Sequence, residues 1–215
     1  MGAELTDERR AGLLGPVEQV APTLLGWSLM AGGVTVRLTE VEAYAGVGQD
    51  PGSHAHRGQT RRNAVMFGEP GHAYLYFTYG MHWCLNVSTG PAGTGAAVLL
   101  RAGEVTGGLE VARERRPGVR DRDLCRGPAR LTRTLWTNGE QGGVDLLDET
   151  SPVRLLPGGS RGRVLIGPRV GVSGPGASTP WRFWLDGEPT VSAYRAAVRR
   201  APRTPPGGPA QDSTA

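Results

Sequence analysis

Alternating hydrophobic and polar positions predict that much of the chain forms strands. Residues 27–44 show this alternation and include a turn at 32–33. Residues 72–88 indicate two further strands around a tight turn at 79–81. Additional strands are expected at 97–102, 164–172 and 181–185.

Helical spacing of apolar residues is confined to three short segments, at 17–25, 107–116 and 126–136. In the last of these, Pro128 suits the first turn of a helix. Many strands with a few segregated helices are typical of an α+β domain around a mostly antiparallel sheet. We therefore predict one α+β domain.

The two ends of the chain differ from this pattern. Residues 1–14 are mostly polar and are expected to form a flexible arm, which leaves 15–200 as the folded domain. Residues 201–215 combine Pro, Gly and small polar residues, so we expect a disordered tail.

A long polar connection at 46–66 has the length of a functional loop.

Composition adds one unusual constraint. The chain has 215 residues and 24 basic side chains, all of them arginine because the sequence contains no lysine. This favours a GC-rich bacterial genome as the source, and it excludes lysine Schiff bases and phosphate-loop lysines. The net charge of +4 is a mild bias toward polyanionic partners.

Other function classes are disfavoured. No apolar run has the length of a membrane span. The two cysteines, Cys84 and Cys125, lie far apart without a Cys-x-x-Cys pair, so we expect reduced thiols and no metal site. The charged opening does not have signal-peptide form. We therefore expect a cytoplasmic protein.

Two carboxylates on one predicted strand are candidates for acid–base chemistry. Glu40 and Glu42 are in phase with Val36 and Leu38, so partial desolvation should make Glu42 a stronger base. In-phase strand neighbours lie roughly 7 Å apart, close to the carboxylate separation of inverting sugar hydrolases. The alternative is that both carboxylates are solvated at a sheet edge.

Aromatic residues are concentrated in the predicted hairpin. Tyr74 and Tyr76 project from one face of a strand and can form a stacking wall or ordinary core. Tyr79 lies at the hairpin tip, where a large ring can insert between DNA bases or fold back over its own hairpin.

Histidines and arginines share the long loop. His54 and His56 have no evident third metal ligand nearby, and we discount zinc. Arg57, Arg61 and Arg62 fit phosphate contacts, although an arginine-only composition gives such clusters by itself.

Two further cations lie at the ends of predicted elements. Arg101 ends an apolar strand and should come close to Glu42. The start of a predicted helix is surrounded by Arg126, Gly127 and Arg130. Backbone N–H groups and two cations would form a phosphate-binding site there.

Taken in order, several motifs carry a family resemblance: EVEAY, SHAHRGQTRRN, MFGEPGHAYLYFTYGMHWCLNVS, AVLLRAGE, LCRGPARL and PRVGV. Over residues 15–194 the chain resembles the alkyladenine, or 3-methyladenine, DNA glycosylase family. Such enzymes flip a damaged purine out of duplex DNA and hydrolyse its N-glycosidic bond, leaving an abasic site. The resemblance implies a curved sheet with short helices around it and a protruding β-hairpin.

The same resemblance assigns roles to individual residues. It implies that Glu42 is the general base that activates water, and that Arg101 and the Val170 carbonyl position this water. The base pocket would consist of Tyr44, His54, Tyr74, Tyr76 and Asn86, with Asn86 excluding the amino group of guanine. Tyr79 would be the wedge in the duplex. The residues themselves, apart from the resemblance, indicate DNA backbone contacts at Arg57, Arg62, Arg126, Gly127 and Arg130.

Two positions depart from the family pattern. Arg61 replaces a proline of the TPRN motif, and His56 occupies a site that is often another aromatic residue or arginine. The expected partner is double-stranded DNA with damaged purines, and we expect a nucleoid-associated monomer without cofactor, metal or strand-cleaving activity.

Two other hypotheses remain open at this point. A sugar hydrolase would use Glu40 and Glu42 as a pair. A non-enzymatic module would recognise distorted DNA through Tyr79 and the arginines.

Overall fold

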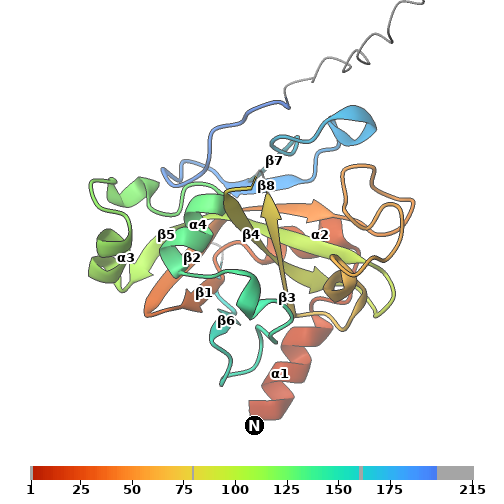
Figure 1. The fold of residues 1–215 in the computed structure, drawn as a ribbon, viewed down its shortest axis with the longest axis horizontal. Coiled ribbons are helices and arrows are strands. Elements are labelled where there is room, and N and C mark those ends of the chain that lie inside the picture. Colours follow the sequence, from red (N-terminus) through yellow and green to blue (C-terminus); the bar gives the residue numbers. More distant parts are fainter. Residues whose placement is uncertain (1, 79, 160–161, 198–215) are drawn as a thin grey trace, which may run out of the picture.

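The centre of the fold is a pair of long antiparallel strands, β2 (Val34–Tyr44) and β5 (Ala96–Gly107). The computed structural model describes residues 2–78, 80–159 and 162–197. All strand pairings in this part of the chain are antiparallel, and β2 pairs with β1 near its start and with β8 near its end. One edge of β2 therefore serves two partners, and the sheet is curved (Figure 1).

The remaining strands complete this sheet in the order β3-β4-β5-β2-β1-β6, with β7 and β8 on a branch from β2. Their bounds are β1 (Ser28–Ala31), β3 (Ala73–Thr78), β4 (His82–Thr89), β6 (Val153–Leu156), β7 (Val164–Gly167) and β8 (Arg182–Leu185).

Three register shifts interrupt the pairing of β2 with β5; one lies between Thr35 and Val36, and the other two flank Glu40. Leu38 pairs with Gly103 and Glu40 with Ala102, so Thr39 has no partner on β5. Val41 then pairs with Leu100, which leaves Arg101 without a partner on β2. Such bulges redirect side chains, and this pair of bulges directs Arg101 toward the carboxylates of β2.

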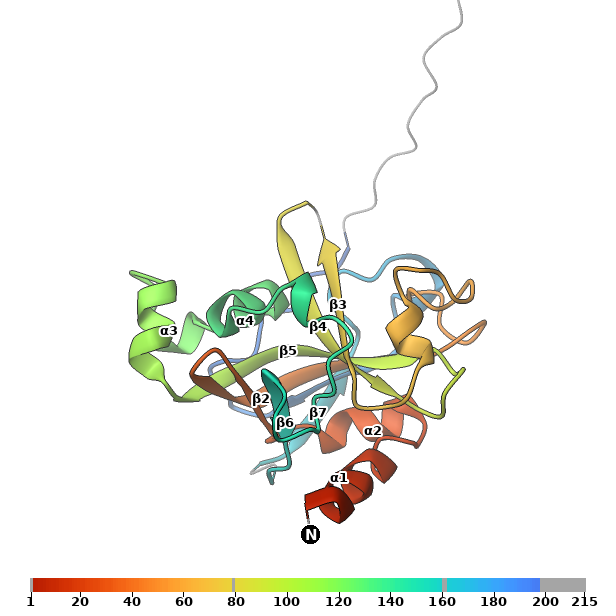
Figure 2. The same ribbon diagram turned by 60° about the horizontal axis from the view of Figure 1, so that its bottom comes forward.

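Short helices cover the sheet. Figure 2 shows α4 (Pro128–Leu135) and α2 (Val17–Thr23) on opposite faces of it. The buried leucines of α4 and the valines of α2 pack into the hydrophobic core. The other helical segments are α1 (Gly2–Ala11), α3 (Leu109–Arg115), η1 (Ala64–Phe67), η2 (Asp121–Asp123), η3 (Gly139–Gln141) and η4 (Gly174–Gly176).

The β3–β4 hairpin protrudes from the body of the molecule (Figure 2). Its pairing runs from Ala73 opposite Val87 to Thr78 opposite His82. Phe77 and Met81, near the tip, are 46% and 68% exposed. The predicted hairpin and the predicted α+β fold are therefore confirmed, whereas Tyr79 lies outside the described residues.

Some elements differ from the sequence expectations. Residues 2–11 form helix α1 instead of an irregular arm, and the helix is attached through an ion pair between Arg10 and Asp145 at 2.6 Å. Strand β6 was not predicted, and residues 168–172 are not strand. The 201–215 segment lies outside the described residues. None of the helices in the described ranges has the length and apolarity needed to cross a membrane.

Candidate active site

Glu42 lies on β2 with its side chain fully buried. One carboxylate oxygen, Oε1, accepts a hydrogen bond of 2.7 Å from the Val170 N–H. The other, Oε2, accepts from the Tyr44 hydroxyl at 2.9 Å and from Arg101 Nη1 at 3.1 Å. The expectation of a desolvated carboxylate is confirmed, and the alternative of solvated carboxylates at a sheet edge is wrong because Glu40 is also fully buried.

The environments of the two glutamates push their pKa values in opposite directions. Burial raises the pKa of Glu42 above its usual range, and the opposing influences of Arg101 and the Val170 N–H do not cancel this effect. Burial also acts on Glu40, but two arginines and the Ser192 N–H outweigh it and lower the pKa of Glu40. Divergent pKa values of neighbouring carboxyls are a feature of acid–base sites. Glu42 is thus the carboxylate suited to proton transfer.

A cavity of about 500 Å³ lies next to the hydrogen-bond donors of Glu42, and Glu42 itself is not among its lining residues. All three groups that donate to Glu42, from Tyr44, Arg101 and Val170, belong to residues that line it. Cys84, for which the sequence analysis proposed no site role, also lines it. The predicted pocket residues Tyr44, His54, Tyr74, Tyr76 and Asn86 all line the same cavity.

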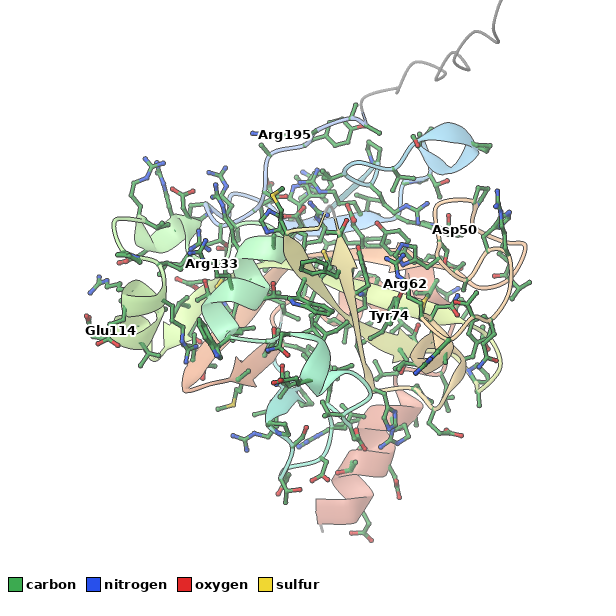
Figure 3. All side chains as sticks on the ribbon, viewed as in Figure 1. Asp50, Arg62, Tyr74, Glu114, Arg133 and Arg195 are labelled. Carbon is green, nitrogen blue, oxygen red and sulfur yellow. The ribbon has the colours of Figure 1, made fainter. Side chains whose placement is uncertain are left out.

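The side chains of the aromatic wall of this cavity contact one another. Nδ1 of His54 lies 2.9 Å from the Tyr74 hydroxyl, and its ring meets Tyr76 edge-on with centroids 4.7 Å apart. Burial, reinforced by Arg62, lowers the pKa of His54, so the imidazole is neutral at pH 7. Figure 3 shows Tyr74 and Arg62 near each other on the side of the molecule that carries the long loop. A neutral imidazole and phenol rings give a surface on which a planar ligand can stack.

Asn86 is held by the hairpin itself. It lies opposite Tyr74 in the β3–β4 register, and its Nδ2 donates a hydrogen bond of 2.9 Å to the Tyr74 carbonyl. This contact orients the amide at the pocket wall, where a polar group can discriminate between ligands.

A buried ion pair that no local sequence pattern predicts lies beside the pocket. Arg169 binds Asp50 with both Nη atoms, and both side chains are almost completely buried. The Arg169 guanidinium also lies 4.6 Å from the ring centroid of Tyr44 and donates to the Ala43 carbonyl. The pair therefore connects the long loop to the end of β2.

A second cavity of about 580 Å³ adjoins the first, and Arg101 and Val170 line both. We call it the arginine cavity; its other arginines are Arg116, Arg120, Arg126, Arg130 and Arg195.

Within this cavity, Asp123 forms ion pairs with Arg126 at 3.3 Å and with Arg130 at 3.9 Å. The start of α4 offers fewer free N–H groups than the sequence predicts. Gly127 donates to the Cys125 carbonyl and Arg130 to the Gly127 carbonyl, and Pro128 has no N–H.

The two predicted DNA-contacting arginines of the long loop, Arg57 and Arg62, are both exposed. The Arg62 guanidinium lies 5.7 Å from the ring centroid of Tyr76, so it also approaches the aromatic wall. The departures from the family pattern, His56 and Arg61, lie in the same loop and do not line the cavity.

Comparison with known proteins gives a consistent result. A family model described as "Methylpurine-DNA glycosylase (MPG)" matches residues 12–189. A protein from Streptomyces avermitilis is 52% identical over 197 residues, which cover 88% of this chain and 92% of that protein. One from Nocardia farcinica is 53% identical over 192 residues, covering 86% and 88% of the two chains. Both are named "Putative 3-methyladenine DNA glycosylase". With the family model matching most of its length and two relatives at about half identity, the chain belongs to the methylpurine-DNA glycosylase family.

Proposed function

We propose that this chain flips alkylated purines out of duplex DNA and hydrolyses their N-glycosidic bond with a water activated by Glu42. As a member of its family, it is a hydrolase of N-glycosidic bonds. The observation that carries the mechanism is the buried Glu42 carboxylate, with its raised pKa, beside an aromatic cavity. Such a carboxylate is a capable general base in a site closed to bulk water.

The proposed reaction uses the groups around Glu42. Glu42 takes a proton from water as the water oxygen attacks the sugar C1′, and the C1′–N bond breaks with its electron pair leaving on the purine. Arg101 and the Val170 carbonyl orient the water, and the Glu42 charge stabilises the cationic sugar in the transition state. Alkylation at N3 or N7 makes the purine cationic, so it leaves without protonation.

The aromatic cavity would hold the flipped base. Tyr44, His54 and Tyr76 supply stacking faces, and π faces favour cationic over neutral purines. A damaged pair unstacks more easily, which adds selectivity before the chemical step. Asn86 would exclude the amino group of guanine, and Tyr79 would fill the gap left in the duplex.

The arginine cavity would take the DNA backbone. Because Arg101 and Val170 line both cavities, a sugar placed between them would point its base into one and its phosphates toward the other. We assign Arg126 and Arg130 to this contact, with Gly127 at the same helix start. Arg57 and Arg62 would contact the backbone on the side of the long loop.

Release of bases from alkylated duplex DNA tests the proposal. We expect wild-type protein to release methylated purines, identified by mass, and Glu42→Gln to bind the same duplex while its release rate falls by about 100-fold or more. Glu104→Gln on the exposed part of β5 is the control and should keep the wild-type rate. Equal release by Glu42→Gln and wild type would refute the assignment.

We also propose that the strand is not cut. Glycosylases with a lyase step commonly attack the sugar with an amine to form a Schiff base. No internal residue offers a lysine amine. Borohydride should therefore trap no covalent DNA adduct on an internal residue, and a trapped adduct would overturn this part of the proposal.

The two other hypotheses are less well supported. A sugar hydrolase needs Glu40 free to act with Glu42, but Arg101, Arg182 and Ser192 occupy the Glu40 carboxylate. A pure DNA-binding module does not need a buried base, and it would release no purine in the experiment above.

A further inference from the structure

A short segment after β8 reaches the buried side of the active site. Residues 190–195 follow the part of the chain matched by the family model, which ends at residue 189. The Gly171 N–H donates to the Arg195 carbonyl, and Arg126 donates to the Val191 carbonyl, so both ends of the segment are attached. Figure 3 labels Arg195 at the far end of this segment. We call residues 190–195 the closing segment.

Ser192 of the closing segment binds Glu40 twice. Its N–H donates to Glu40 Oε2 at 2.7 Å, and its hydroxyl donates to Oε1 at 2.9 Å. Glu40 Oε1 also accepts from Arg182 Nε at 2.7 Å. The fully buried carboxylate therefore has partners on both oxygens before Arg101 is counted.

Arg101 is the link from this cluster to Glu42. Its Nε donates to Glu40 Oε1 at 2.9 Å, and its Nη1 donates to Glu42 Oε2 at 3.1 Å. Because the guanidinium is planar, a hydrogen bond that fixes Nε also fixes the direction of Nη1. Arg101 lies at a bulge and has no strand partner on β2 to hold it.

The cluster is also balanced in charge. Glu40 and Glu42 contribute two negative charges, and Arg101 and Arg182 contribute two positive charges, all of them buried. An isolated buried charge is costly, so each member needs the others to stay ionised. Glu40 therefore holds Arg101 in place. Because Arg101 also pairs with Glu40, its positive charge stabilises Glu42 less than it would in an exclusive pair.

We propose that Glu40, Arg182 and Ser192 form a positioning unit that holds Arg101 against Glu42 and the reacting water. The inference rests on the proposed function. It gives Glu40 a role other than that of a second catalytic carboxylate, and it makes the closing segment part of the active-site scaffold. Ser192 also lines the arginine cavity, but Glu40 and Arg182 line neither cavity, and the hydrogen bonds of the Ser192 hydroxyl and N–H go to Glu40 and Arg101. The unit therefore acts through Arg101.

The pH dependence separates this role from simple structural support. The titratable and charged groups that interact with Glu42 are Glu40, Tyr44, Tyr76, Cys84, Arg101 and Arg169. Among them, Glu40 carries a like charge and raises the pKa of Glu42. Replacing Glu40 by the neutral Gln removes this repulsion, so the acid limb of base release should move to lower pH.

Single-turnover base release from a duplex with one alkylated purine tests the unit. We expect Ser192→Ala to release base at least about tenfold more slowly than wild type, with unchanged affinity for the damaged duplex. Glu40→Gln should show a comparable loss together with the shifted acid limb. Thr190→Ala is the matched control, because it removes a buried hydroxyl contact with Thr39 from the same segment without touching the unit.

Each result has a distinct meaning. If wild type releases no base, the proposed function fails. If wild type is active and Ser192→Ala matches Thr190→Ala, the positioning unit is refuted even where Glu40→Gln does not fold. An unshifted acid limb in a folded Glu40→Gln variant also contradicts it.

Discussion

At the scale of single residues, the site depends on how burial and charge compete at Glu42. Burial raises the pKa of this carboxyl, whereas Arg101, the Val170 N–H and the Tyr44 hydroxyl stabilise the ionised form. A general base needs both influences, because it must be ionised at the working pH and still bind a proton in the transition state. Each donor to Glu42 therefore sets part of the pH profile.

Tyr44→Phe tests this balance at one atom. The substitution keeps the aromatic ring but removes a hydroxyl that donates to Glu42 Oε2 at 2.9 Å. Because this hydrogen bond lowers the pKa of Glu42, its loss should raise that pKa and move the acid limb of base release to higher pH. Single-turnover rates measured across pH give the shift. Glu104→Gln, at an exposed side chain on β5, is the control and should leave the limb unchanged, and a limb displaced to lower pH in Tyr44→Phe would contradict the argument.

At the scale of elements, the helices and strands that could be predicted are those with a regular pattern of apolar and polar residues. The hairpin, the β1–β2 turn and the helices α2, α3 and α4 follow from periodicity and turn residues, and the structure confirms them. Helix α1 was not predicted, because its polar residues show no apolar stripe. Strand β6 was not predicted either, although β7 and β8, which are equally short, were.

The candidate site was predicted only as far as its motifs allow. Glu42, Tyr44 and the hairpin residues lie in recognisable motifs and line or adjoin one cavity. The partnership of Asp50 with Arg169 joins residues 119 positions apart, and no local pattern reveals it. The bulges at Thr39 and Arg101 were likewise invisible, since alternation assumes an unbroken register.

The β2–β5 pairing next to the Arg101 bulge gives a prediction at this scale. A Cβ added at Gly103 would lie 2.4 Å from both the Arg37 carbonyl oxygen and a Val36 methyl carbon, so the strands would have to separate. We expect Gly103→Ala to lower the free energy of unfolding by about 2–3 kcal/mol, measured by urea denaturation. Gly159→Ala, where a Cβ meets open space, should change it by less than about 1 kcal/mol. Equal stabilities of the two variants would show that the pairing tolerates the added atom.

At the scale of the whole molecule, the charge is small and its distribution matters more than its sum. The net charge of +4 alone gives weak attraction to DNA. The arginine cavity concentrates cations beside the aromatic cavity, and the only acidic side chain among its lining residues in the described part of the chain is Asp123. The opposite edge of the sheet, at β6, lies far from this cavity in the strand order.

This asymmetry predicts which arginines control affinity for duplex DNA. A side chain that contacts a phosphate releases counterions, so its removal weakens binding to every sequence and reduces the salt dependence by about one unit of slope. We expect this result for Arg130→Gln in the arginine cavity, measured as the logarithm of the binding constant against the logarithm of salt concentration. Arg154→Gln on β6 removes the same charge from the other edge and should leave the slope unchanged. If both variants changed the slope equally, DNA attraction would arise from net charge alone, and the placement of the backbone at the arginine cavity would be wrong.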